Sequence, residues 1–348
     1  MSKVSHEEFQ HPFGLQYFGL KLVAFILRGL SSLAQSRAKK LQLAAIPHNV
    51  TRSRIEIPSR EAGRCISVDV YRRRQTKGGV DVGASDPPSA VHLNFHGSGF
   101  VVPGLGGDIA FCARLASEVD VVVLDCDYRK APEGQSSTSL ERPQCVAYIC
   151  NHNKAPFPAG HNDTLDVFAY VIANPTSFAP NKISVGGFSA GANLGMALVV
   201  SDSLPKDSFT SVISFYGNPN ISKPTPSPPS KTFTSGILLP DIVRRIFYAS
   251  YMLPAVDQKN IGLSPFYAPV DRWPKNILIT CGEADSLWVP GKELVDKLKG
   301  KGLEVEWHSV PNAAHAFDKG VMVKESAEET KQKVDNVYSQ AIEMIRRS

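Results

Sequence analysis

The sequence lacks the features that mark several classes of protein. Its six cysteines include no Cys-x-x-Cys pair, so their spacing predicts neither a zinc site nor a disulfide framework. We therefore expect free thiols in a reducing compartment, the cytoplasm. A net charge of +5 over 348 residues is too small an excess to favour nucleic-acid binding. With 43% hydrophobic and 20% charged residues, the chain is also unlike a disordered protein.

A long uninterrupted apolar run is missing as well. Residues 13–34 are rich in apolar side chains, but Lys21, Arg28 and three glycines interrupt them, and a membrane-spanning helix needs about 20 apolar residues. Residues 6–8 read His-Glu-Glu, unlike the basic start of a signal peptide. We expect an amphipathic helix packed on the protein, with peripheral membrane contact through residues 13–34 as the alternative.

Eight apolar, β-branched segments have the length of strands and alternate with helix-like segments. The inner strands are continuous hydrophobic runs, as expected for parallel strands buried on both faces. This alternation predicts an α/β fold, with a mostly parallel eight-stranded sheet and helices on both faces. The expected strands are residues 54–57, 66–71, 91–95, 121–125, 182–186, 211–216, 276–281 and 303–310, and the expected helices are 109–119, 140–150, 192–200, 292–298 and 324–345.

Two stretches interrupt the alternation. Residues 218–236 are rich in proline, serine and threonine and lead into a helix-like segment at 241–251, which is typical of an insertion with a lid helix. Residues 75–89 are rich in glycine, serine and proline and are expected to form a surface hairpin loop. The functional site is expected beyond the carboxyl ends of the strands.

A G-x-S-x-G motif follows the strand at 182–186. Residues 187–191 read Gly-Phe-Ser-Ala-Gly and lead into a helix, which is the strand–turn–helix context of a nucleophilic serine. Side chains at positions 187 or 191 would collide with the neighbouring strand and helix. Ser189 is therefore the candidate nucleophile, with positive potential from the helix N-terminus beneath it.

A glycine-rich turn ends the strand at 91–95, where residues 96–99 read His-Gly-Ser-Gly. Acyl transfer needs N–H donors where negative charge develops on the carbonyl oxygen, and losing one donor costs about 2.7–4 kcal/mol of barrier. The amides of Gly97, Ser98 and Ala190 are the candidates for this oxyanion hole. An ordinary turn between strand and helix is the alternative.

Two later strands end close to an acid and a histidine. Asp285 follows the strand at 276–281, and His315 follows the strand at 303–310. The order Ser, Asp, His is the one that α/β-hydrolases use. His315 is therefore the candidate base, and Asp285 is the candidate carboxylate that orients it. Glu283 is the rival acid.

Together these motifs resemble those of the hormone-sensitive-lipase-like α/β-hydrolases, a family of carboxylesterases, lipases and arylacetamide-deacetylase-like enzymes. The family's His-Gly-Gly-Gly turn corresponds to residues 96–99, its Asp-Tyr-Arg-Leu-Ala-Pro-Glu motif to 127–133 and its serine elbow to 187–194. Its His-x-Phe motif corresponds to residues 315–317. The resemblance covers about residues 88–345.

The resemblance implies the roles of the residues and the division of the chain. Ser189 would be the nucleophile, His315 the general base and acid, and Asp285 the orienting carboxylate, with no metal or cofactor. The family's cap comes from the N-terminal segment and from an insertion after the sixth strand. This implies an N-terminal cap segment at 1–50, a first part of the core at 51–217, a lid insertion at 218–262 and a second part of the core at 263–348.

Three positions depart from the family's pattern. Ser98 replaces a glycine of the oxyanion turn, and we expect its hydroxyl to enter the mouth of the site. Phe188 replaces an acidic residue before the nucleophile, and Ser286 replaces the proline after the acid. None of these changes removes a catalytic group, so they indicate a specialised choice of substrate.

The residues predict a serine hydrolase that cleaves ester or thioester bonds of small molecules with apolar or aromatic acyl groups. The first alternative is a biosynthetic enzyme using the same site for acyl transfer or polyketide thioester release. The second is a non-catalytic binding protein of the same fold. Four aromatic residues beside the motif loops are expected to line an apolar pocket or to pack in the core: Phe100, Tyr216, Trp288 and Phe317. The oligomeric state stays open.

Overall fold

The computed structural model describes residues 15–74, 76–77, 80–81, 88–132, 155–253, 255–321 and 323–348. Its main sheet consists of β1 (Val50–Pro58), β2 (Cys65–Arg73), β5 (Ser89–Phe95), β6 (Val121–Cys126), β7 (Phe178–Phe188), β8 (Ser211–Phe215), β9 (Asn276–Gly282) and β10 (Val305–Val310). The strands lie in the order β1-β2-β6-β5-β7-β8-β9-β10. Only β2 runs antiparallel to its neighbours, and every pair from β6 to β10 is parallel. The predicted fold is confirmed, and each of the eight expected strands is present.

Helices connect the strands, as the alternation predicts. The expected segments at 109–119, 192–200, 292–298 and 324–345 are all helical, and the segment at 140–150 lies outside the described residues. The expected loop at 75–89 contains a short antiparallel pair, β3 (Thr76–Lys77) with β4 (Val80–Asp81). The helices are α1 (Leu15–Ala44), α2 (Ile109–Glu118), α3 (Ala159–Ala173), α4 (Ala190–Val199), α5 (Asp241–Tyr251), α6 (Trp288–Lys299), α7 (Ala327–Arg347), and the short 3₁₀ turns η1 (Pro265–Tyr267), η2 (Val270–Arg272) and η3 (Phe317–Lys319).

The sheet separates two hydrophobic clusters. Successive side chains of a strand point to opposite faces, so Val122 and Leu124 of β6 join one cluster while Val121 and Val123 join the other. Helices α3, α4 and α6 pack on the first face, and α2 and α7 pack on the second. Burial on both faces explains why the inner strands are apolar throughout.

Helix α3 was not among the expected helices, because acidic side chains occupy its buried face. Asp163 forms ion pairs with Arg64 and Arg129, and Asp166 pairs with Arg60. Burial raises the pKa of Asp163, and the two arginines offset part of that rise. The ion pairs tie α3 to the loop between β1 and β2 and to the loop after β6.

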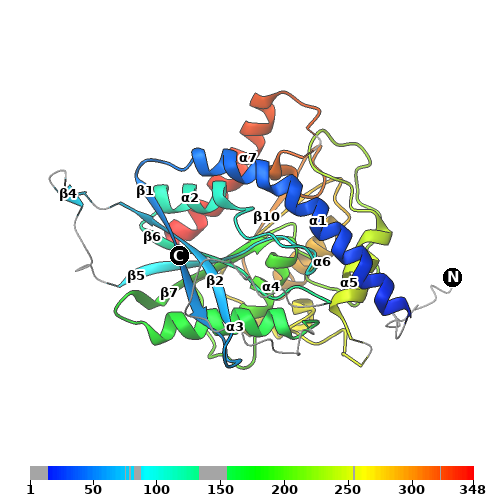
Figure 1. Ribbon diagram of the computed structural model, residues 1–348, viewed down its shortest axis with the longest axis horizontal. Coiled ribbons are helices and arrows are strands. Elements are labelled where there is room, and N and C mark those ends of the chain that lie inside the picture. The colour runs from blue at the N-terminus through cyan, green and yellow to red at the C-terminus, as the bar shows by residue number, and fades with distance from the viewer. Residues whose placement is uncertain are drawn as a thin grey trace.

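Helix α1 is longer than the apolar segment that predicts it. In Figure 1 its N-terminal part lies beside α5, with which it is in contact. Its buried Arg28 donates from Nε to the Val101 carbonyl at 2.9 Å and from an amino group to the Ala131 carbonyl at 2.8 Å. Within the described ranges, no helix has both the length and the apolar character to cross a membrane.

Candidate functional site

Ser189 lies on the sharp turn between β7 and α4, with φ at 53° and ψ at −116°. Such a backbone costs of order 1–3 kcal/mol for a residue with a side chain. A Cβ at position 187 would lie 2.4 Å from the carbonyl oxygen of Phe95, and one at position 191 would lie 1.9 Å from it. The two glycines of the motif therefore allow β5 to approach the turn that presents Ser189.

The structure brings together the three side chains that the sequence predicts to act as one unit. Ser189 Oγ lies 2.9 Å from His315 Nε2, and His315 Nδ1 lies 2.7 Å from Asp285 Oδ2. The other oxygen of Asp285 accepts a hydrogen bond from the Leu287 amide at 2.9 Å. The rival acid Glu283 instead accepts from the hydroxyl of Ser309 at 3.0 Å. Asp285 is therefore the carboxylate bonded to the imidazole.

The charges around His315 favour its protonated form. Burial lowers the pKa of His315, but the charge and hydrogen bond of Asp285, together with the charge of Asp318, outweigh it and raise the pKa above 6.5. The ring of Tyr216 contacts the imidazole edge to face, with 4.9 Å between centroids. A base of this kind accepts a proton readily from a hydroxyl placed at Nε2.

A buried polar cluster supports the loop that carries His315. Asp318 accepts hydrogen bonds from the hydroxyls of Tyr216 and Tyr338, each at 2.6 Å, and pairs with Lys319 at 2.8 Å. Lys319 also pairs with Asp108 at 2.7 Å. Its ammonium lies 3.6 Å from the centre of the Phe188 ring, so Phe188 contacts a cation at the position where the family has an acid.

The three candidate oxyanion donors are available. The amides of Gly97, Ser98 and Ala190 donate to no acceptor in the described part of the chain. The Ser98 hydroxyl does not follow the expectation that it enters the mouth of the site. It lies 2.7 Å from the Tyr128 hydroxyl and accepts from the Phe100 amide at 2.9 Å. These two bonds turn it back into the loop, so it does not narrow the site.

A cavity of about 30 Å³ adjoins Ser189, and Phe100 lines it. The other three aromatic residues that the sequence offers as pocket residues are not among its lining residues, which corrects that expectation. Tyr216 and Phe317 are buried in the core against each other, with 5.9 Å between ring centroids. Trp288 packs on Trp307 and donates to Ser309 Oγ at 2.8 Å. Each therefore has a packing role.

Helix α5, the predicted lid helix, and the loop before it supply lining residues that are not among the expected site residues. Leu239, Arg244, Phe247 and Tyr248 line the cavity from residues 239–248. The Phe247 ring lies so close to Gly99 that a Cβ on the glycine would be 2.2 Å from it. In the sequence, only the spacing of residues 244 and 248 could have pointed to this lining, because it puts them on one face of a helix.

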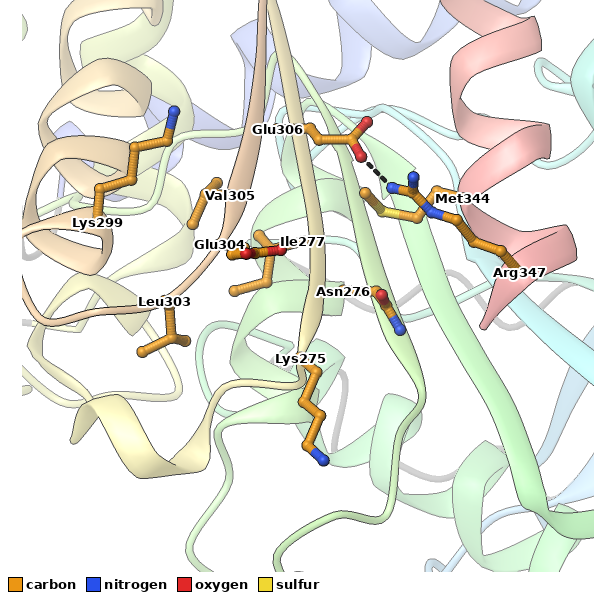
Figure 2. A pocket seen from close by; sticks show the side chains of 10 residues that line it. All are labelled: Lys275, Asn276, Ile277, Lys299, Leu303, Glu304, Val305, Glu306, Met344 and Arg347. Carbon is orange, nitrogen blue, oxygen red and sulfur yellow. Dashed lines mark hydrogen bonds and ion pairs between the residues drawn. The ribbon is translucent and has the colours of Figure 1, made fainter.

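A larger cavity of about 350 Å³ lies elsewhere, against the amino ends of β9 and β10 and the end of α7 (Figure 2). Its lining includes the ion pair between Glu306 and Arg347 but no serine, cysteine or histidine. It lies at the amino ends of the strands, whereas Ser189 follows the carboxyl end of β7, so this cavity is not the site of nucleophilic chemistry. Among the residues with described positions, no cluster of three metal-ligating side chains is present.

Comparison with known proteins agrees with this geometry. Residues 92–155 and 144–319 match the family described as alpha/beta hydrolase fold. The carboxylic ester hydrolase LipN of Mycobacterium tuberculosis is 26% identical over 64% of this chain and 56% of its own length. The versiconal hemiacetal acetate esterase of Dothistroma septosporum is 30% identical over 34% of this chain and 30% of its own length. An esterase of Pyrobaculum calidifontis has a TM-score of 0.67 at 24% identity, over 91% of this chain and 92% of that one.

The chain thus spans little more than half of the mycobacterial relative and less than a third of the fungal one. The likeness to the archaeal esterase concerns the fold. The family match itself covers well over half of the chain. The chain therefore belongs to the family with the alpha/beta hydrolase fold, which confirms the resemblance to hormone-sensitive-lipase-like hydrolases that its motifs indicate.

Proposed function

We propose that this protein is a serine hydrolase that cleaves carboxylic ester or thioester bonds of small molecules with an apolar or aromatic acyl group. The observation that carries the proposal is the pair of contacts from Ser189 to His315 and from His315 to Asp285, at 2.9 and 2.7 Å. Membership of the hydrolase family and the activities in the names of the two curated relatives support it.

The first half-reaction forms an acyl-enzyme. The Asp285 carboxylate accepts from Nδ1–H of His315, which leaves Nε2 free to take the proton of Ser189 as Oγ attacks the acyl carbon. The carbonyl oxygen becomes an alkoxide, which accepts hydrogen bonds from the amides of Gly97, Ser98 and Ala190. His315 then gives its proton to the departing alcohol or thiol as the bond to the acyl carbon breaks.

The second half-reaction releases the acid. His315 takes a proton from water, whose oxygen attacks the acyl carbon, and the same amides hold the second alkoxide. The proton returns to Ser189 Oγ as the acyl–serine bond breaks. An intact set of reacting groups favours catalysis over the non-catalytic alternative. No specific contact favours an acceptor other than water.

The direct test is labelling with a fluorophosphonate probe, followed by mapping of the labelled peptide. The expected result is a single adduct on Ser189 and turnover of p-nitrophenyl esters that Ser189→Ala abolishes. Ser203→Ala is the matched control, because Ser203 is exposed and does not line the cavity beside Ser189. Absence of labelling, or labelling of a different serine, overturns the proposal.

We assign the cap to residues 1–50 and 218–262, which lie before and between the core segments at 51–217 and 263–348. Two observations support this division. Arg28 of α1 bonds to the loops on the oxyanion side, and α5 lines the cavity with Ser189. Excision of 218–262 with a short linker is expected to leave the sheet folded and to expose Ser189, which protease protection and probe labelling would reveal.

The cap segment also offers a surface for peripheral membrane contact through residues 13–34. Leu22, Phe25 and Ile26 of α1 are 61%, 75% and 50% exposed, and α1 contains no acidic residue. Such a face suits the boundary between lipid headgroups and acyl chains. Vesicle sedimentation of a variant with serine at these three positions tests this contact, and unchanged binding would contradict it. Cys112, Cys126 and Cys281 are free and buried, which supports a reducing compartment such as the cytoplasm.

A further inference from the structure

Arg244 is a buried cation beside the candidate nucleophile. It lies on α5, its side chain is 9% exposed, and it lines the cavity that Ser189 also lines. Burial lowers the pKa of Arg244, and nearby Tyr248 and Asp285 offset part of that effect. A guanidinium is costly to bury unless its donors are used. The buried guanidinium beside Ser189 therefore needs hydrogen-bond acceptors for its N–H groups.

The partner present is a weak one. Within the described residues, Arg244 pairs only with Asp241, through one amino group. Asp241 lies one turn earlier on the same helix, and its side chain is 66% exposed. An ion pair with an exposed carboxylate contributes little stability, because water can take the place of the cation at little cost in free energy. The remaining guanidinium donors are left for a group inside the cavity.

A second donor lies one turn later on the same face of α5. The buried hydroxyl of Tyr248 accepts a hydrogen bond from Asn218 Nδ2 at 2.7 Å and donates to no described residue. Its own hydrogen is therefore free to point into the cavity, which Tyr248 lines together with Arg244. The i and i+4 spacing places the phenol and the guanidinium side by side. Together they form a two-residue donor set.

We infer that Arg244 and Tyr248 bind a carboxylate of the substrate, so that the preferred substrates are esters or thioesters that also carry an acidic group. The inference rests on the proposed function, because it names the substrate class of that same site. A guanidinium binds a carboxylate through two parallel hydrogen bonds, and the phenol adds a third. Leu239 and Phe247 line the same cavity, so the body of the substrate is apolar.

The test compares acids with their neutral amides. One pair, 4-carboxyphenyl acetate and 4-carbamoylphenyl acetate, carries the group on the alcohol side of the ester. The other, monoethyl adipate and its monoamide, carries it on the acyl side. We expect the wild-type enzyme to prefer the acid of one pair by about 10- to 100-fold in kcat/KM, chiefly through KM, as for a hydrogen bond between charged groups. The pair that shows the preference identifies the side.

Variants of α5 separate binding from a structural role. Arg244→Met should abolish the preference while the neutral ester changes less than about threefold, Arg244→Lys should keep part of it, and Tyr248→Phe should lower it by about 3- to 10-fold. The matched control is Arg245→Met, which removes the same charge from the next, exposed position. Asp241→Asn should raise the preference, because it frees the guanidinium.

The outcomes distinguish the inference from the proposed function. If the wild type cleaves both members of each pair at rates within about threefold, the inference is wrong and the hydrolase function stands. If Asp241→Asn and Arg244→Met lower the turnover of acid and amide alike, the ion pair only supports the helix, and the inference is again wrong. If no ester is cleaved and Ser189 takes no probe, the hydrolase function itself is wrong.

Discussion

Replacing Asp285 by asparagine tests the proposed roles most sharply, because the side chain keeps its shape. One carboxylate oxygen accepts from His315 Nδ1 at 2.7 Å and the other from the Leu287 amide at 2.9 Å. An asparagine has only one accepting oxygen. If that oxygen serves Leu287, the amino group faces Nδ1 and moves the imidazole proton to Nε2. There it prevents His315 from taking the proton of Ser189.

The expected loss in kcat is about 10⁴-fold, the size seen when the imidazole of a serine hydrolase has the wrong tautomer. This loss corresponds to an increase of about 5–6 kcal/mol in the activation free energy. The assay is the steady-state hydrolysis of p-nitrophenyl butyrate. Glu283→Gln is the matched control, since Glu283 bonds to Ser309 and should change kcat less than about threefold. A kcat for Asp285→Asn within tenfold of the wild type, or a large loss for Glu283→Gln, would refute the assignment.

Three further predictions concern the base, the elbow and the cap. Since His315 acts in its neutral form and its pKa is raised above 6.5, kcat/KM should fall as the pH drops through a value above 6.5; a pH–rate profile with its acid limb below 6.5 would contradict this. Gly191→Ala places a Cβ 1.9 Å from the Phe95 oxygen and should destabilise the fold by more than about 3 kcal/mol in urea unfolding. Arg28→Met removes two hydrogen bonds to backbone carbonyls and should cost about 3 kcal/mol in the same assay, whereas Lys40→Met, at an exposed position, should cost little.

The strands and the convergence of Ser189, Asp285 and His315 are predictable because they depend on local patterns. A parallel strand buried on both faces is a continuous apolar run, and the loop after it meets the other loops at one edge of the sheet. Each of the three residues stands within a few positions of such a run. The spatial order of the strands does not follow from these patterns, because β6 lies between β2 and β5 although β5 comes before it in the chain.

The features that the sequence does not predict depend on packing between distant segments. Arg244 lies 55 residues after Ser189, and only the seating of α5 on the core turns it toward the cavity. The direction of the Ser98 hydroxyl depends on Tyr128, which comes from the next strand's loop. Helix α3 carries buried acids, and two of their arginine partners, Arg60 and Arg64, are about 100 residues away, so its apolar periodicity is weak.

The bonds of Arg28 also bear on how the protein should be prepared for assay. They join a helix near the start of the chain to carbonyls at residues 101 and 131, close to the amides proposed to hold the alkoxide. A shortened form beginning after residue 44 would leave both carbonyls without that donor and would remove the neighbour of α5. Rates measured on such a shortened protein would reflect a site whose cap and neighbouring loops are altered. Substrate screening therefore belongs on protein that retains residues 15–44.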